Sequence, residues 1–200
     1  MQNMQNEMRS DNNDGELLRQ AAAGDVSAFE KLIINYEKLI FSQAFRMLGN
    51  AWDARDAAQE SLIKIYNNIH KCHDIKSFKR WIRAITNNTC IDELRRRKNK
   101  REDSLNRIFE TEDGEAVLQF ESKDPGPETR LIGLEKQERI QLAINRLPGK
   151  YRSLIVLRDI NGLSYEELSE TTGLSMGTVK SRLSRARSRL KKLLADEYTF

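Results

Sequence analysis

The chain has 200 residues, of which 38% are hydrophobic and 32% are charged, and it contains only 10 glycines and 3 prolines. This balance is typical of a soluble helical chain and argues against a β-rich architecture. Two cysteines and two histidines indicate a reducing compartment and not a disulfide scaffold. The polar N-terminus lacks the apolar core of a signal peptide, and no stretch reaches the roughly 20 apolar residues of a membrane span. We therefore expect a cytoplasmic protein with no direct membrane insertion.

Residues 15–101 have the apolar periodicity of a helical block, and the polar N-terminus before them, residues 1–14, is expected to be disordered. The first long helix is predicted to begin with a capping box, in which Ser27 is followed three residues later by Glu30. Gly49 is suited to the end of this helix because glycine readily adopts the left-handed conformation of a C-cap.

Two more helices are predicted in this block, over residues 53–69 and 77–98. The second buries an apolar side that includes Trp81, which we interpret as a core residue. Its opposite side is basic, and six basic residues fall within the eight positions 94–101. This charge could bind a stretch of nucleic acid, or it could be a solvated run that keeps the chain soluble.

Residues 102–128 form an acidic stretch with nine acidic and two basic side chains. Low hydrophobicity combined with high net charge predicts a flexible linker. Helical periodicity returns in residues 129–200. The sequence therefore predicts an all-α protein with two small helical domains joined by a flexible acidic linker.

The second block ends in the pattern of a helix-turn-helix. The short segment "SYEELSETTG" ends in glycine, and Ser175 is the candidate N-cap of the helix that follows. Leu168 on the first helix is expected to pack against Val179 and Leu183 on the second.

The last helix carries seven basic side chains and no acidic one over residues 177–192. At about 100° per residue, small polar residues and Arg185 lie opposite the apolar stripe, and other cations lie on the flanks. This layout suits a helix in a DNA major groove, where Arg185 could contact guanine and the flanking cations could hold phosphates. The alternatives are a solvated basic helix and a membrane-surface helix, which would need a broader apolar side with aromatic residues.

The helix predicted over 53–69 has an unusual outer side, on which Asp53, Asp56 and Glu60 surround Ile63. An apolar side chain among acids is typical of a protein-binding surface. The alternative is a solvated acidic turn that the helix dipole favours.

Three segments carry a resemblance to one family. "DARDAAQESLIKIY" resembles the pattern D-A-x-D-x-x-Q-E, "FKRWIRAITNNTCIDELRRRK" resembles F-x-x-W-L-x-x-I-A-x-N-x-x-I-D-x-x-R-R, and "GTVKSRLSRAR" resembles G-T-V-K-S-R-L-x-R-A-R. Together and in this order they resemble bacterial RNA polymerase sigma factors of the extracytoplasmic-function (ECF) type, in the sigma-70 family. The likeness extends over about residues 15–195.

The resemblance implies a sigma factor that binds core RNA polymerase and directs initiation at promoters with −35 and −10 elements. Residues 15–101 would be sigma region 2, which docks on the clamp coiled coil of the largest subunit and recognises and melts the −10 element. Residues 129–200 would be sigma region 4, a helix-turn-helix that reads the −35 element and meets the flap. The linker, residues 102–128, would pass through the polymerase. An anti-sigma factor is a further expected partner, and neither enzymatic activity nor a cofactor is expected.

Helix faces and the resemblance together assign three sets of site residues. The expected RNA polymerase-binding residues are Asp53, Asp56, Gln59, Glu60 and Ile63. The residues expected at −10 DNA are His70, Lys71, Cys72, His73, Lys79, Arg80, Arg83, Asn87, Asp92, Arg95 and Arg96. The residues expected at −35 DNA are Ser175, Thr178, Lys180, Ser181, Arg182, Ser184, Arg185 and Arg187.

An enzyme and a stand-alone helix-turn-helix regulator of duplex DNA are the alternative functions. The chain has no P-loop, G-x-G-x-x-G, G-x-S-x-G or H-E-x-x-H pattern. His70, Cys72, His73 and Cys90 follow no usual zinc spacing, so no metal site is expected. A stand-alone regulator would carry a ligand pocket, a phosphoacceptor domain or a dimerisation helix in its first block, where this chain has an acidic outer face.

Overall fold

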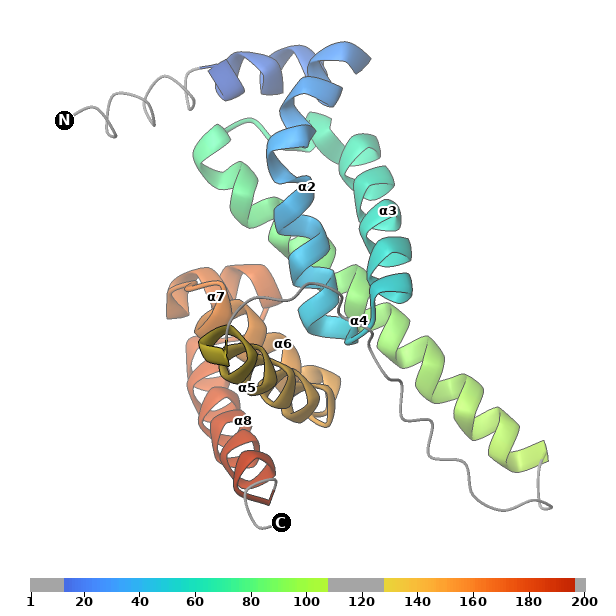
Figure 1. Cartoon of the computed structure of the whole chain (residues 1–200). Coiled ribbons are helices and arrows are strands. Elements are labelled where there is room, and N and C mark those ends of the chain that lie inside the picture. Colours follow the sequence, from blue (N-terminus) through green and yellow to red (C-terminus); the bar gives the residue numbers. More distant parts are fainter. Residues whose placement is uncertain (1–12, 108–127, 197–200) are drawn as a thin grey trace.

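The computed structural model describes residues 13–107 and 128–196, and every regular element in these two ranges is a helix (Figure 1). The N-terminal bundle comprises a helix over 13–22, α2 (Val26–Leu48), α3 (Ala51–Asn68), the short turn η1 (Ile69–Lys71) and α4 (Ile75–Arg107). The C-terminal bundle comprises α5 (Glu128–Asn145), α6 (Gly149–Ile155), the π-helical turn η2 (Val156–Ile160), α7 (Tyr165–Thr172) and α8 (Met176–Asp196). The predicted all-α class is confirmed. Within the same two ranges, no helix combines the length and apolar character that a bilayer span requires.

The start of α2 differs from the prediction, and its end agrees with it. Asp25 is the N-cap, and its carboxylate accepts a hydrogen bond from the backbone N–H of Ala28 at 3.1 Å. Ser27 therefore lies inside the first turn, and the predicted capping box of Ser27 and Glu30 is wrong. Both Asp25 and Ser27 are good N-cap types, so composition alone does not choose between them. At the other end Gly49 has a φ of 84°, as the C-cap prediction requires.

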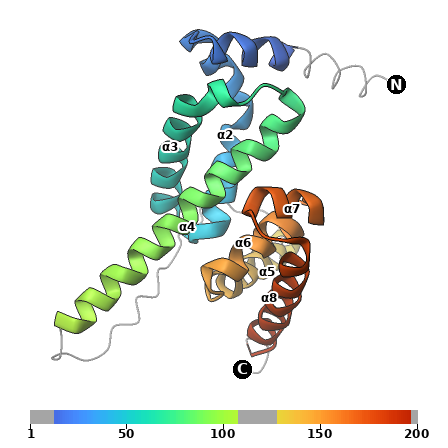
Figure 2. The same cartoon turned by 180° about the vertical axis from the view of Figure 1, so that it is seen from behind.

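The limits of the two blocks also differ slightly from the predicted ones. Helix α4 runs on to Arg107 and so includes the first six residues of the predicted linker, whereas α5 begins at Glu128. Residues 13 and 14, predicted with the disordered N-terminus, belong to the first helix. The remaining linker residues, 108–127, and residues 1–12 lie outside the described part of the chain. Figures 1 and 2 both show the last turns of α4 extending beyond the two bundles.

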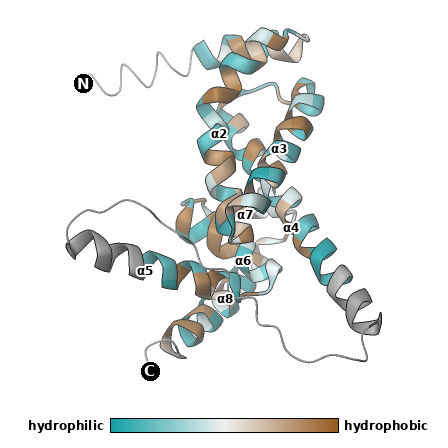
Figure 3. Ribbon diagram, turned by 45° about the vertical axis from the view of Figure 1, so that its right-hand side comes forward, coloured by the Kyte–Doolittle hydropathy of each residue, from teal (hydrophilic) through white to brown (hydrophobic). Residues whose placement is uncertain are grey.

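Two apolar cores hold the helices together. In Figure 3 the labelled helices carry both apolar and polar residues, as expected when each helix buries one side. One core lies within the N-terminal bundle and is built around Leu32, Ile40 and Phe78. The other is shared, because Met47 of α2 packs in the same cluster as Leu157, next to α6. The two predicted domains are therefore in direct apolar contact in this structure.

Candidate functional site

Helix α3 presents an exposed acidic and apolar surface, as predicted. Asp56, Gln59, Glu60 and Ile63 are exposed, and 61% of Ile63 is accessible to solvent. The opposite side of α3 is buried through residues such as Ala57 and Ile65 against α2 and α4. An exposed isoleucine beside two carboxylates leaves apolar surface available for a partner.

Asp53 has a different environment from the rest of this set. It is half-buried, it accepts a hydrogen bond from the side chain of Asn50, and it pairs with Arg97 of α4 at 2.5 Å. Burial disfavours the charged form of Arg97, but hydrogen bonds to Glu93 and Asp53 outweigh it and raise the pKa of Arg97. Asp53 therefore holds α3 against α4, and its carboxylate is already engaged within the bundle.

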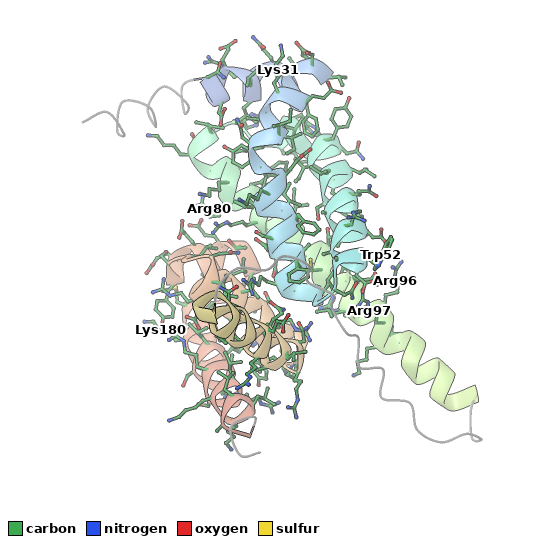
Figure 4. The ribbon with its side chains drawn as sticks, viewed as in Figure 1. Lys31, Trp52, Arg80, Arg96, Arg97 and Lys180 are labelled. Carbon is green, nitrogen blue, oxygen red and sulfur yellow. The ribbon has the colours of Figure 1, made fainter. Side chains whose placement is uncertain are left out.

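Trp52 is an additional exposed residue that the sequence analysis missed. Its side chain is 77% exposed, and the guanidinium of Arg55 lies 5.7 Å from its ring centroid. Figure 4 labels Trp52 in the first turn of α3. Because Trp52 precedes Ile63 by eleven residues, or about three helical turns, the two lie on one side of α3. That spacing was the available signal, but the helix was predicted to begin one residue later, at Asp53. We call Trp52, Asp56, Gln59, Glu60 and Ile63 the docking face.

The loop between α3 and α4 has an exposed side and a buried side. His70, Lys71 and His73 are exposed, whereas Cys72 is only 5% exposed. The Cys72 thiol donates to the carbonyl of Asp74 at 3.8 Å, and burial raises the pKa of this thiol. Cys72 was predicted among the DNA-facing residues, but its side chain packs into the core of the N-terminal bundle instead.

Trp81 is half-buried and lies between two clefts, so its interpretation as a simple core residue is incomplete. A cleft of about 440 Å³ is lined by Trp81 together with Lys71, His73 and Arg80. A second cleft of about 450 Å³ is lined by Trp81, Lys71 and Lys64. Aromatic rings next to cations are the usual platform for unstacked bases. The sequence signal was an aromatic residue within a strongly basic helix.

The basic side of α4 faces the C-terminal bundle. We call Lys79, Arg80, Arg83 and Asn87 the −10 face. Arg80 pairs with Glu170 of α7 at 3.1 Å, and Figure 4 labels Arg80 where α4 meets α7. Arg83 donates to the carbonyl of Asn161 at 2.9 Å, and burial lowers the pKa of Arg83. Asn87 is 1% exposed. Three of the four predicted DNA-binding side chains are therefore occupied by the protein itself.

The next turns of α4 are more open. Asp92, Arg95 and Arg96 are exposed, and Arg95 lies 3.6 Å from Asp92 in an ion pair that solvent weakens. Asp92 and Arg95 line a cleft of about 730 Å³ between the bundles, together with Lys150 and Arg182 of the C-terminal bundle.

Helices α7 and α8 form the predicted helix-turn-helix. Ser164 and Glu167 make a reciprocal capping box at the start of α7, and the helix ends at Gly173 with a φ of 67°. Leu168 and Val179 are fully buried and Leu183 is 1% exposed, which confirms the predicted packing of the two helices. Ser175 receives a long hydrogen bond, 3.4 Å, from the backbone N–H of Thr178, which is half-buried.

The residues of α8 that were predicted to face bases lie on its exposed side. Lys180, Ser181, Ser184 and Arg185 are all exposed, and Lys180 lies on the outer side of the C-terminal bundle in Figure 4.

Two predicted phosphate-facing residues of α8 are placed differently from this set. Arg182 lines the cleft between the bundles, and Arg187 pairs with Asp159. Hydrogen bonding to Asp159 raises the pKa of Arg187. Nucleic acid would have to compete with Asp159 for the guanidinium of Arg187.

The described residues contain no group of three or more His, Cys, Asp or Glu side chains that could hold a metal ion. Cys90 is fully buried, and burial raises the pKa of its thiol to about 12. The His and Cys residues of the loop and of α4 are therefore not gathered into a common site.

Comparison with known proteins identifies the two bundles. Residues 32–100 match the family model described as Sigma-70 region 2, and residues 137–190 match the one described as Sigma-70, region 4. The chain is 36% identical over 180 residues to the ECF RNA polymerase sigma factor SigW of Bacillus subtilis, with 90% of this chain and 95% of SigW aligned. The chain belongs to the ECF sigma factors.

Other relatives agree with this assignment. This ECF sigma factor is 31% identical to the RNA polymerase sigma-H factor of Pseudomonas aeruginosa, over 94% of its own length and 96% of the relative. Among solved structures it is similar to the sigma factor RpoE of Bartonella quintana in complex with the anti-sigma factor NepR. That match has a TM-score of 0.62 and 26% identity, and it covers 85% of this chain and 98% of RpoE.

Proposed function

We propose that this ECF sigma factor binds core RNA polymerase through α3 and directs it to promoters by reading a −10 strand with the N-terminal bundle and a −35 duplex with α8. One observation carries the proposal: a single chain presents an acidic apolar surface, an aromatic cleft with cations and an exposed helix-turn-helix on separate elements. A stand-alone regulator needs only the last of these. The family assignment supports the polymerase subunit over that alternative.

The docking face supports binding to the polymerase. Trp52 and Ile63 offer exposed apolar area, and Asp56 and Glu60 beside them favour a partner with basic residues around an apolar groove. Exposed tryptophans of this kind often dominate the energy of an interface. We assign this face to the clamp coiled coil of the largest subunit, and the C-terminal bundle to the flap.

The loop and Trp81 support capture of a single strand at the −10 element. An unpaired base stacked on an aromatic ring contributes about 1–3 kcal/mol, and cations such as Lys71 can hold the neighbouring phosphates. These energies stabilise melted DNA without any chemical step. We therefore propose that the protein acts only by binding and is not an enzyme.

Helix α8 supports readout of the −35 element in the major groove. Its exposed Arg185 can form two parallel hydrogen bonds with guanine, and Lys180, Ser181 and Ser184 lie on the same exposed side. Arg187, which Asp159 already engages, is expected to contribute less to phosphate binding than its position in the sequence suggested.

Two further assignments complete the proposal. The likeness to RpoE, which was solved with the anti-sigma factor NepR, supports an anti-sigma factor as a partner of this chain. Because the promoter DNA and polymerase lie in the cytoplasm of a bacterium, we place the protein there.

In vitro transcription tests the function directly. Core RNA polymerase would be incubated with fragmented genomic DNA, with and without this protein, and the 5′ ends of the transcripts mapped. New start sites that share paired motifs about 35 and 10 base pairs upstream are expected. If a known sigma factor activates the same core and this chain yields no new starts, the proposal fails.

A further inference from the structure

We propose that the cleft between α4 and the C-terminal bundle binds a nucleotide that carries several phosphates, with a nucleoside triphosphate as the model ligand. This inference goes beyond the proposed function, which assigns only proteins and promoter DNA as partners. The cleft has a volume of about 730 Å³, and Figures 1 and 2 both show α4 beside the C-terminal bundle, where it lies. We call it the interbundle cleft, and its lining residues fall within 87–98 of α4, 148–154 at the start of α6, 172–174 after α7, and Arg182 of α8.

Among the described residues that line the interbundle cleft, four are cations and one is a carboxylate. The cations are Arg95 and Lys98, one turn apart on α4, Lys150 in the first turn of α6, and Arg182 on α8. The carboxylate belongs to Asp92, which lies 3.6 Å from Arg95 in an exposed ion pair. The cleft therefore gathers more positive charge than its own carboxylate can neutralise. A multivalent anion would relieve the repulsion among these cations.

In the part of the chain that the structure describes, the two cations of the C-terminal bundle pair with no carboxylate. The ammonium of Lys150 lies 5.3 Å from the ring centroid of Tyr151, a contact that leaves its charge in place. Arg182 is half-buried, and within residues 13–107 and 128–196 it makes no hydrogen bond or ion pair. Arg187, by contrast, is already engaged by Asp159. A guanidinium that has lost part of its water without gaining an acceptor is a favourable site for an oxyanion.

An unsatisfied donor lies at the buried end of the interbundle cleft. Asn87 is 1% exposed, and its side-chain oxygen accepts a hydrogen bond from the Ser153 hydroxyl at 2.6 Å. Its side-chain nitrogen is buried and, among the described residues, has no hydrogen-bond partner. A buried donor without an acceptor costs free energy. Because Asn87 and Ser153 both line the cleft, a phosphate oxygen or ring nitrogen of a ligand could accept from this amide after a small rotation of the side chain.

The remaining wall of the interbundle cleft suits the organic part of a nucleotide. It includes the aliphatic side chains of Ile91 and Leu94 on α4, Leu154 on α6 and Leu174 before α8. Sites for small organic ligands commonly have volumes of about 300–1,000 Å³ and combine apolar walls with a few polar groups. A nucleotide uses both parts, because its base can cover aliphatic surface while its phosphates reach the cations. Inorganic polyphosphate would leave the aliphatic wall uncovered, and a fatty acid would leave most of the cations without a partner.

The promoter strand is the competing occupant, because Asp92 and Arg95 are also expected at −10 DNA. The hydrogen bond between Asn87 and Ser153 joins α4 to α6 and closes one end of the interbundle cleft. A strand would have to continue past that end, whereas a small ligand can stop there. The phosphates of a nucleoside triphosphate also concentrate several negative charges in a small volume. The closed end and the four cations therefore favour a small polyphosphate over a polymer.

Calorimetric titration of the full-length protein tests the site without polymerase or DNA. The probes would be ATP, GTP and inorganic tripolyphosphate, each titrated in the same buffer at physiological salt, which screens weak surface attraction. At least one nucleotide should bind with one-to-one stoichiometry and at least fivefold more tightly than tripolyphosphate. Equal affinity for tripolyphosphate, or no saturable binding of either nucleotide, would overturn the proposal.

Two substitutions locate the binding. Arg182→Gln and Lys150→Gln should each weaken nucleotide binding at least fivefold, because each removes one cation of the interbundle cleft. Arg189→Gln is the matched control, since Arg189 lies two turns from Arg182 on the same side of α8 and does not line this cleft. Lys150 is exposed, so its substitution should leave the fold intact even if Arg182→Gln does not. Equal losses in all three variants would reveal a diffuse charge effect and contradict the site.

A single-stranded oligonucleotide without a terminal phosphate distinguishes the two occupants. Its affinity should fall less than twofold in Arg182→Gln and in Lys150→Gln, because the −10 strand is assigned to α4 and the loop before it. A loss as large as that of the nucleotide would assign the interbundle cleft to promoter DNA and overturn the proposal. None of these titrations contains polymerase, so failure of the proposed function in transcription would leave their outcome unchanged.

Discussion

Asp159 and Arg187 form a bidentate ion pair that joins the π-helical turn η2 to the recognition helix α8. The Nε of Arg187 lies 3.1 Å from one carboxylate oxygen, and a terminal nitrogen lies 2.5 Å from the other. The residues are 28 positions apart in the chain, so the pair links α8 to η2, the turn that follows α6. A residue expected on DNA phosphates is thereby held by its own domain.

The Asp159→Asn substitution tests whether this ion pair positions α8, because the two alternatives predict opposite changes in affinity for −35 DNA. If the pair positions α8, the variant should bind −35 duplex less tightly, with a loss of stability below about 1 kcal/mol because the pair is partly exposed. If Arg187 serves only phosphates, removing the carboxylate should strengthen DNA binding. Holoenzyme affinity for a mapped promoter distinguishes the two, with Arg187→Ala measured alongside.

Arg185→Ala should cost about 1–3 kcal/mol at one base pair of the −35 element, because a bidentate contact with guanine is lost. The effect should disappear when that base pair is changed. Competition among promoter fragments with single substitutions measures this directly. Arg189→Ala is a suitable control, since the Arg189 guanidinium lies 5.1 Å from the ring centroid of Tyr151 and should not alter base preference.

Trp52→Ala and Ile63→Asp should each weaken binding to core polymerase at least tenfold while leaving the melting temperature almost unchanged. Both side chains are exposed, so the fold loses little when they are replaced. Ile34→Asp provides the matched control, because Ile34 is 64% exposed on a different helix, α2. Equal losses from all three variants would contradict the docking assignment.

Arg152→Met should lower the free energy of unfolding by about 2–3 kcal/mol, because Arg152 satisfies carbonyl groups at the ends of two helices. It donates to Met47 near the end of α2, and to Asn145 and Leu147 at and after the end of α5. Burial lowers its pKa to about 10, which still leaves it charged at neutral pH. Arg152→Lys should recover only part of the loss, since an ammonium lacks the planar fork. Urea denaturation of the parent, Arg152→Met and Arg152→Lys measures these free energies of unfolding.

Cys90 should make stability depend on alkaline pH. Burial raises its pKa from 9.0 to about 12, so the unfolded chain ionises this thiol at a lower pH than the folded chain does. The free energy of unfolding is therefore unaffected by this thiol below pH 9. It falls as the pH rises toward 12, and the loss reaches about 2 kcal/mol at about pH 10.5. Urea denaturation at increasing pH should show a shallower decline for Cys90→Ala than for the parent.

Local spacing was sufficient to predict the helices that carry the candidate sites. The helix-turn-helix follows from apolar residues three and four positions apart, from a capping serine and from Gly173, all of which act over one or two turns. The exposed side of α3 followed from the same periodicity. Trp52 was missed because the helix was predicted to begin at Asp53, two residues after the observed start of α3 at Ala51.

The tertiary environment of individual side chains could not be predicted in this way. Cys72 and Trp81 lie in polar, basic stretches, and whether each is buried depends on helices distant in the sequence. The contact of Asn87 with Ser153 spans 66 positions, and no periodic pattern connects them. The choice of Asp25 as N-cap over Ser27 was open for another reason, since the two types have similar capping energies.

The uninterrupted length of α4 sets a mechanical limit on the protein. Its 33 residues extend about 50 Å at 1.5 Å per residue, so the helix holds the loop between α3 and α4, at its start, far from Arg107, at its end. From Arg107 to Glu128 the chain can span at most about 75 Å when fully extended. These two lengths together limit the distance between α8 and the loop that joins α3 to α4. Lengthening the segment between Arg107 and Glu128 should therefore relax the tolerated spacing between the two promoter elements, whereas shortening it should restrict that spacing.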